Sequence, residues 1–220
     1  MNYSIGQGDT LVTPIQMARI YAALSNGGTL YKPIVGKAII SADGKHIREI
    51  KPEAQGKLPV NRALHKDMNA ALAAVASRGT AAWRFATAPD PWPQSKIPMH
   101  AKTGTAEVFG KQTTSWFTTY TKDYTVVMTI SQGGTGSGAS GPAVRNIYDA
   151  LYGVGADGAI DKKKALLPHP QRGLPKVDSD GSIIAPEIKP YDPKSAEPEV
   201  VGQAEEAQRA YNERSNEFRQ

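Results

Sequence analysis

A lysine, a glycine and two hydroxyl side chains stand together in the segment Lys102-Thr103-Gly104-Thr105. The surrounding residues, 99–108, alternate small and polar types and contain no proline, which predicts a β-strand. On a strand, Thr103 and Thr105 project from one face, while Lys102 and Gly104 lie on the other. A glycine inside a strand marks a place where another molecule approaches the backbone closely.

Two hypotheses fit this strand. Backbone donors, hydroxyl groups and a nearby cation are the parts needed to bind an extended peptide that ends in a carboxylate. Alternatively, the strand lies at a solvent-facing edge of a sheet, where its lysine discourages edge-to-edge aggregation. The residues of the strand by themselves leave both interpretations open.

Other kinds of active site find less support. Cysteine is absent and the four histidines show no ligand spacing, so we expect no disulfide and no metal site. The glycine-rich segment 133–141 falls between a predicted strand and a predicted helix, but it lacks the pattern of a phosphate-binding loop and is expected to be flexible. The sequence presents neither carboxylates paired by spacing for acid–base catalysis nor a serine on a nucleophile elbow.

The elements that would position residues 102–105 begin with a helix. Thr-Pro at 13–14 is typical of a helix start, and Asn-Gly-Gly at 26–28 is typical of a left-handed helix end. This helix is apolar nearly all round, so we expect it to be buried. Since little sequence precedes it, we expect an upstream segment to supply part of the core.

A hairpin and a second helix follow. Asp-Gly at 43–44 predicts a turn between strands at 32–41 and 45–50. Residues 61–77 have helical apolar spacing behind an asparagine N-cap. Four prolines make 82–98 an irregular connection.

Three strands and a last helix complete the pattern. The strand at 99–108 is followed by strands at 115–121 and 124–131, and this close spacing predicts an antiparallel meander. The spacing of the apolar residues in 142–152 predicts a helix. The fold class is therefore α+β, with an antiparallel β-sheet flanked by helices.

The last part of the sequence differs in composition. Residues 168–198 contain seven prolines and few large apolar residues, too few to offset the entropy of ordering. Residues 197–218 are expected to form at most a transient or peripheral helix. We therefore expect a partial domain at 1–153 and a low-complexity, disordered, Pro-rich and charged extension at 154–220.

The net charge of +5 is unevenly distributed. Residues 1–152 hold 16 basic and 9 acidic side chains, whereas 153–220 hold 10 and 12. The basic residues are dispersed and no nucleic-acid-binding motif accompanies them, so we expect no nucleic-acid partner. The sequence has no apolar run that could cross a bilayer and no signal peptide; any export signal would lie outside this chain.

A family resemblance brings these observations together. Residues 5–28, Ile-Gly-Gln-Gly-Asp-Thr through Ser-Asn-Gly-Gly, resemble the signature of the transpeptidase domain of class B penicillin-binding proteins, with the elongation-type enzymes closest. Lys-Thr-Gly-Thr at 102–105 resembles the third active-site motif of these enzymes. Gly-Thr-Ala at 79–81 and Trp-Phe at 116–117 stand at the expected distances, so the resemblance covers residues 3–152. The Pro-rich tail is similar to extensions of some actinobacterial members.

The resemblance implies an antiparallel sheet flanked by helices, no cofactor, and a role for each residue of the motif. A serine of such enzymes attacks the penultimate D-alanine carbonyl of a peptidoglycan stem peptide and passes the acyl group to an amine of a neighbouring stem; β-lactams acylate the same serine. Lys102 would orient and tune the proton relay, and the Thr103 and Thr105 hydroxyls would bind the substrate carboxylate. The Thr105 N–H would form half of the oxyanion hole. Gly104 would keep the strand bare for the substrate.

The sequence departs from the family in one respect. It contains neither the Ser-x-x-Lys that carries the nucleophile nor a Ser-x-Asn. Both motifs precede the third one in the family, so we expect this chain to be the C-terminal part of a transpeptidase domain, inactive without its N-terminal part. It would act at the extracytoplasmic face of the cell membrane, with its anchor outside this chain. The alternatives are a non-catalytic module that binds the cell wall or a division or elongation partner, and a β-lactamase relative.

Overall fold

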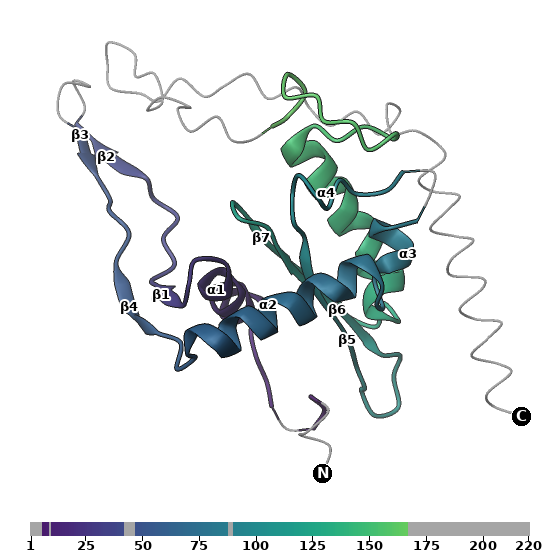
Figure 1. Ribbon diagram of the computed structural model, residues 1–220. Helices are drawn as coiled ribbons and strands as arrows, with labels where there is room; N and C mark the ends of the chain where they lie inside the picture. The colour runs from purple at the N-terminus through teal and green to yellow at the C-terminus, as the bar shows by residue number, and fades with distance from the viewer. Residues whose placement is uncertain (1–5, 9, 42–46, 88–89, 167–220) are drawn as a thin grey trace, which may run out of the picture. The chain divides into compact units, whose positions relative to one another are not determined.

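The computed structural model describes residues 6–8, 10–41, 47–87 and 90–166 (Figure 1). The predicted Asp-Gly turn at 43–44 and the extension beyond residue 166 lie outside the described residues, and the domain boundary near 153 stays a prediction. The chain divides into two units; the first holds residues 1–39 and 49–171, and the second includes, of the described residues, only 40–41 and 47–48. The described helices are α1 (Pro14–Ser25), α2 (Arg62–Ser77), α3 (Ala82–Phe85) and α4 (Gly141–Tyr152), with a π-helical turn η2 (Gly136–Ser140).

An antiparallel three-stranded sheet organises the first unit. Its strands are β5 (His100–Ala106), β6 (Thr114–Tyr120) and β7 (Thr125–Ile130), in the spatial order β5-β6-β7. The predicted meander is therefore confirmed, and β5 stands at one edge of the sheet. Thr103 faces Phe117 and Thr105 faces Ser115 across the β5–β6 pair.

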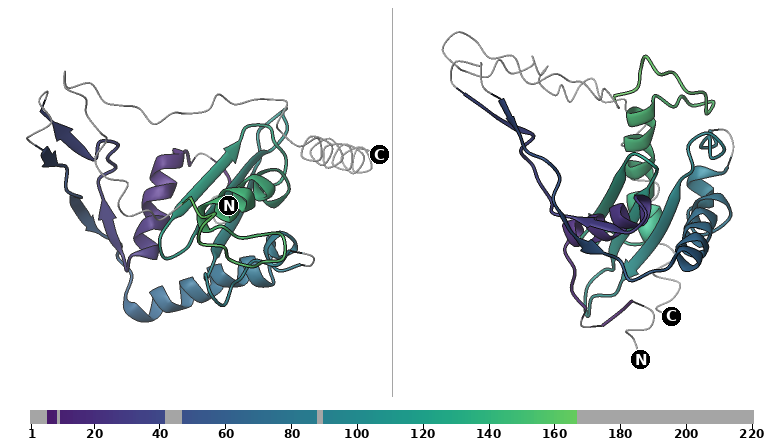
Figure 2. Two further views of the ribbon diagram at one scale, coloured as in Figure 1. Left: turned by 90° about the horizontal axis from the view of Figure 1, so that it is seen from above. Right: turned by 60° about the vertical axis from the view of Figure 1, so that its left-hand side comes forward.

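Helices pack on both faces of this sheet (Figure 2). Phe117 lies on the face that also carries Thr103 and Thr105, and it packs in one cluster with Val144 of α4. Tyr120 projects from the opposite face, where its ring makes an edge contact with Tyr21 of α1. The sheet thus lies between α1 and α4, which is the flanked antiparallel sheet that the sequence predicts.

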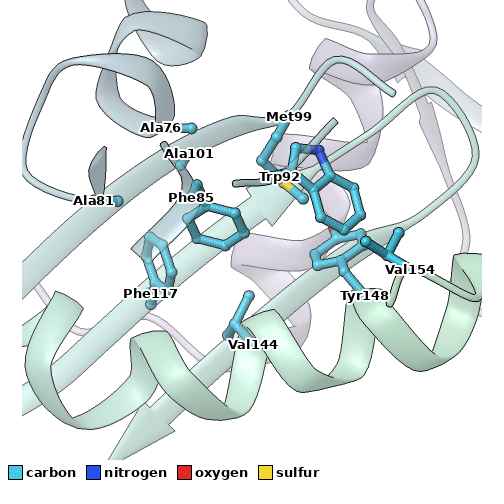
Figure 3. Close-up of a cluster of buried hydrophobic side chains, with 10 residues drawn as sticks. All are labelled: Ala76, Ala81, Phe85, Trp92, Met99, Ala101, Phe117, Val144, Tyr148 and Val154. Carbon is cyan, nitrogen blue, oxygen red and sulfur yellow. The ribbon is translucent and has the colours of Figure 1, made fainter. Parts of the chain in front are cut away.

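The core lies between the sheet, α3 and α4, and Figure 3 shows its side chains converging. Trp92 belongs to this core although it comes from the connection predicted to be irregular. Its ring makes edge contacts with Phe85 and Tyr148, and its Nε1 donates to the Ile97 carbonyl at 2.7 Å. The buried members are Ala76, Ala81, Phe85, Trp92, Met99, Ala101, Phe117, Val144, Tyr148 and Val154.

A buried arginine joins α4 to the connection before β5. Arg145 is 1% exposed, and its Nε donates to both carboxylate oxygens of Asp149, at 2.8 and 3.0 Å. Its Nη1 donates to the carbonyls of Arg84 and Asp90, at 3.0 and 2.8 Å. The guanidinium therefore binds groups on three segments at once, and these contacts offset part of the cost of burying its charge.

Helix α1 begins as predicted but is not buried. Thr13 and Gln16 form a capping box and Pro14 occupies the first turn. However, Ile15 and Ile20 are 55% and 41% exposed, so the expectation of a helix buried on all sides was wrong. The physical reason is that the main contacts of α1 run to β1, β6 and β7, which cover one side of the helix.

The region between α1 and α2 contains two short ladders. Strand β2 (Ala38–Ile40) pairs with β3 (Ile47–Glu49), as the hairpin prediction requires, while β1 (Thr29–Tyr31) pairs with β4 (Ala54–Lys57). The β1–β4 pair was not predicted, and residues 32–37 are not part of a strand. The proline at position 33 lacks the N–H that an uninterrupted strand would use. None of the helices in the described ranges combines the length and hydropathy needed to cross a bilayer.

Candidate functional site

The segment 102–105 lies in the middle of the edge strand β5. Lys102 and Thr105 are exposed, while Thr103 and Gly104 are half-buried. The Lys102 Nζ donates to the Thr103 carbonyl at 2.6 Å. The candidate residues therefore remain accessible, as a strand that binds a ligand along its edge requires.

The hydrogen bonds of Gln7 reveal which way the β5 backbone points. The Gln7 Nε2 donates to the Thr105 carbonyl at 2.8 Å, and the Glu107 N–H donates to the Gln7 Oε1 at 3.0 Å. In an antiparallel strand, the N–H and C=O of one residue face the same side. The N–H of Thr105 therefore points away from β6, toward the free edge, where it can stabilise a negative oxygen.

A third threonine joins the site from the end of α2. The hydroxyl of Thr80 lies 2.8 Å from that of Thr103. Gly79 makes the tight turn that brings Thr80 there, since a Cβ at position 79 would lie 2.8 Å from Val75 Cα. Sequence reasoning noted Gly-Thr-Ala at 79–81 only as a helix end and part of the resemblance, and it did not place Thr80 in the site.

The glycine-rich segment packs on β5 and is ordered. Its Gly136 N–H donates to the Thr105 hydroxyl oxygen at 3.3 Å. A Cβ at Gly136 would lie 2.5 Å from the carbonyl oxygens of both Gly104 and Trp116, so only glycine fits against the strand. The expectation of a flexible loop at 133–141 was wrong, because residues 136–140 form η2.

Buried hydroxyls hold η2 in place behind the site. Ser115 of β6 donates to the Thr135 carbonyl at 2.9 Å, and its oxygen lies 2.7 Å from that of Ser140. Ser115 and Ser140 are fully buried, so each hydroxyl needs these partners. The turn that meets Thr105 is thereby fixed to the sheet.

The first residue of β5 is held by aromatic packing on the Lys102 face. The His100 ring stacks on the Tyr120 ring at 4.5 Å between centroids, with 2° between the planes. Burial lowers the pKa of His100, which favours the neutral imidazole. Tyr120, the last residue of β6, in turn donates its hydroxyl proton to the Asn69 side chain of α2, which links that helix to β6.

A second glutamine clamps the backbone just before β5. The Met99 N–H donates to the Gln94 Oε1 at 3.0 Å, and the Gln94 Nε2 donates to the Met99 carbonyl at 2.9 Å. Gln94 and Gln7 thus bracket β5. Within the described ranges, no group of three His, Cys, Asp or Glu side chains is placed to hold a metal ion.

Comparison with known proteins identifies the family. Residues 1–149 match the family model described as penicillin binding protein transpeptidase domain. The chain belongs to this family. The residues that match the penicillin-binding family model include all of β5, β6 and β7, and thus the segment 102–105.

Individual penicillin-binding proteins are similar over part of their length. Penicillin-binding protein 2A of Bacillus subtilis (strain 168) is 32% identical over 114 residues, which are 50% of this chain and 15% of that protein. A structure of penicillin-binding protein A from M. tuberculosis, an imipenem acyl-enzyme complex, aligns with a TM-score of 0.55 at 22% identity, over 67% of this chain and 33% of that one. A crystal structure of PBPA from M. tuberculosis aligns with a TM-score of 0.54 at 20% identity, over 67% and 34%. This likeness confirms the α+β fold, and the chain spans 15% to 34% of the length of these relatives.

Proposed function

We propose that this chain supplies the substrate-binding strand of a D,D-transpeptidase that cross-links peptidoglycan stem peptides by serine acyl transfer. The observation that carries the proposal is the outward edge of β5, where the Thr105 N–H and two threonine hydroxyls lie beside a lysine. The family match over residues 1–149 supports the same reading.

Each group of the segment has a chemical part in this proposal. The hydroxyls of Thr103 and Thr105 donate to the terminal carboxylate of the stem peptide, and the Lys102 ammonium attracts it. The carboxyl end then lies near Thr103, and the preceding residues run along β5 toward Glu107. The Thr105 N–H meets the penultimate carbonyl oxygen and stabilises the negative charge that develops there.

The covalent steps need a serine that this sequence lacks in a Ser-x-x-Lys setting. In the proposal, that serine belongs to an N-terminal part of the domain. Its oxygen bonds to the penultimate carbonyl carbon, the C–N bond to the last D-alanine breaks, and the leaving amine takes the serine proton. The amine nitrogen of a neighbouring stem peptide then bonds to the ester carbonyl carbon, the C–O bond to the serine breaks, and the serine oxygen takes the proton that the amine loses.

The same site would accept β-lactams, whose carboxylate and reactive carbonyl resemble the peptide end. The imipenem acyl-enzyme complex of the M. tuberculosis protein supports this ligand class. The reaction would take place at the extracytoplasmic face of the membrane, in an elongation-type enzyme whose domain ends near residue 153. Residues 154–220 would form an extension that follows the domain, and its first residue, Val154, still packs in the core.

Labelling with a fluorescent penicillin tests the proposal. We expect no labelling of the 220-residue chain and stoichiometric labelling of a protein extended upstream in its own reading frame to include Ser-x-x-Lys. In that protein, Lys102→Ala and Thr105→Val should each slow acylation about tenfold or more, because each removes a side-chain group that binds the carboxylate; Thr105→Val leaves the backbone N–H in place. Lys111→Ala, at an exposed lysine outside the motif, should not. Equal acylation rates in all four proteins would contradict the proposal.

A non-catalytic binding module is the second candidate, and the missing Ser-x-x-Lys and Ser-x-Asn motifs favour it. Such a module would bind cell-wall peptide or a partner through β5 without acylation. An extended protein that binds D-alanyl peptides but never labels with penicillin would favour this candidate over the transpeptidase.

A further inference from the structure

Gln7 occupies a place on the free edge of β5 that a peptide ligand needs. Its amide donates to the Thr105 carbonyl and accepts from the Glu107 N–H, at 2.8 and 3.0 Å. In the sequence, Gln7 is 98 positions away from Thr105 and 100 positions away from Glu107. Figure 2 shows the segment before α1 running beside the end of the sheet. A primary amide carries one acceptor and a donor side by side, so Gln7 satisfies the edge as an added strand would.

The direction of the ligand determines which of these bonds it competes for. With its carboxylate at Thr103 and its preceding residues toward Glu107, the peptide runs antiparallel to β5. In such a pair, one ligand residue exchanges both hydrogen bonds with one strand residue. The residue whose carbonyl meets the Thr105 N–H therefore presents its own N–H to the Thr105 carbonyl, which is the acceptor that Gln7 Nε2 holds.

We propose that the Gln7 side chain is a displaceable internal competitor for the ligand amide at Thr105. The inference rests on the proposed function, because it takes the site of the reacting carbonyl from it. Gln7 is then a positioning residue that keeps the edge paired when the site is empty. The hydrogen bond to the Thr105 carbonyl also restricts the substrate class. The ligand residue with the reacting carbonyl must carry an N–H that can donate, as in an acylated peptide.

A ligand titration of the 220-residue chain tests the competition. The probe is an N-acetylated tripeptide ending in D-Ala-D-Ala, and its dissociation constant is measured by NMR. Because one net hydrogen bond no longer opposes binding, Gln7→Ala and Gln7→Ser should bind the probe about threefold to tenfold more tightly than wild type. Gln94→Ala removes the same kind of clamp at Met99, away from Thr105, and should not tighten binding.

Two further measurements separate the contact from the competition. Amide exchange at Glu107 should be faster in the unliganded Gln7→Ala chain than in wild type; equal exchange would overturn the contact and the inference with it. A probe methylated on the nitrogen of the penultimate D-alanine cannot donate to Thr105, so it should lose the gain seen with Gln7→Ala.

The outcomes also distinguish this inference from the function on which it rests. If wild type binds the probe and both Gln7 substitutions leave the dissociation constant unchanged or raise it, the inference is overturned but the proposed function is not. If no variant binds the probe, or if a C-terminal carboxamide binds equally well, the carboxylate site of the proposed function fails, and the inference falls with it.

Discussion

The hydroxyl oxygens of Thr80 and Thr103 lie 2.8 Å apart, although 23 positions separate the two residues in the chain. A hydroxyl has one proton to donate and two lone pairs. If Thr103 donates its proton to a carboxylate, it can still accept the proton of Thr80. The pair can thus act as a chain of hydrogen bonds that ends on the ligand, and such chains strengthen each bond.

Substitution of Thr80 by valine should therefore weaken ligand binding without disturbing the fold. We expect the penicillin acylation rate of the upstream-extended protein to fall about threefold to tenfold, the effect of one net hydrogen bond. Thr87→Val is the matched control, because the Thr87 hydroxyl donates to the nearby Ala82 carbonyl rather than to β5. Equal losses in both variants would contradict a specific role for Thr80.

Substitution of Gly136 by alanine should separate η2 from β5. The added Cβ would lie 2.5 Å from two backbone carbonyl oxygens, which cannot move as a flexible side chain can. We expect the free energy of unfolding, measured by urea denaturation, to fall by about 1–3 kcal/mol. Gly141→Ala should cost far less, since its Cβ would lie 3.9 Å from the Trp83 ring, an ordinary van der Waals contact. A neutral Gly136→Ala variant would show that η2 is not packed on the strand.

Replacement of Arg145 by methionine should destabilise the fold strongly. It would leave the Asp149 carboxylate and the carbonyls of Arg84 and Asp90 without their buried donor. Breaking a buried pair from one side costs about 3–5 kcal/mol. Lys32→Met is the control, because the Lys32–Glu53 pair is exposed and such pairs contribute about 0–1 kcal/mol. Similar unfolding free energies for both variants would argue against a structural role for Arg145.

Acid should destabilise the fold through His100. Burial lowers its pKa below 6.5 in the folded state, so the unfolded chain binds the proton more readily. The stability that His100 contributes is therefore present above pH 6.5 and is lost as the pH falls below that value. His100→Phe keeps a ring against Tyr120 but cannot titrate. The difference in unfolding free energy between wild type and this variant should shift against wild type as the pH falls from 8 to 5; a constant difference would contradict the prediction.

Much of the fold could be predicted from short-range patterns. The Thr-Pro helix start at 13–14, the N-cap at Asn61 and the alternation along 99–108 each depend on neighbouring residues, and the structure confirms the helices and the strand that they predict. The β1–β4 ladder escaped prediction because it pairs short segments with weak alternation of their own.

The site shows a similar division. The segment 102–105 carries its chemistry in adjacent residues, so its position on a strand could be inferred directly. Gln7 and Thr80 reach the same strand only through tertiary folding, and no local pattern marks a glutamine or threonine as a partner of β5. The prediction for the glycine-rich segment failed for the same reason, because Gly136 allows close packing against Gly104, which is distant in sequence.

The two glutamines that bracket β5 reconcile the pair of hypotheses raised by its sequence. Gln94 binds the backbone of Met99 at one end of β5, and Gln7 binds the Thr105 carbonyl near the other. Between these two sites, the Lys102 ammonium donates to the Thr103 carbonyl. Few backbone N–H and C=O groups of β5 are therefore left for a strand of another molecule to pair with. This lets the protein expose an edge strand to water with less tendency to aggregate. If β5 binds a peptide as proposed, protection from self-assembly and peptide binding both depend on this one strand edge.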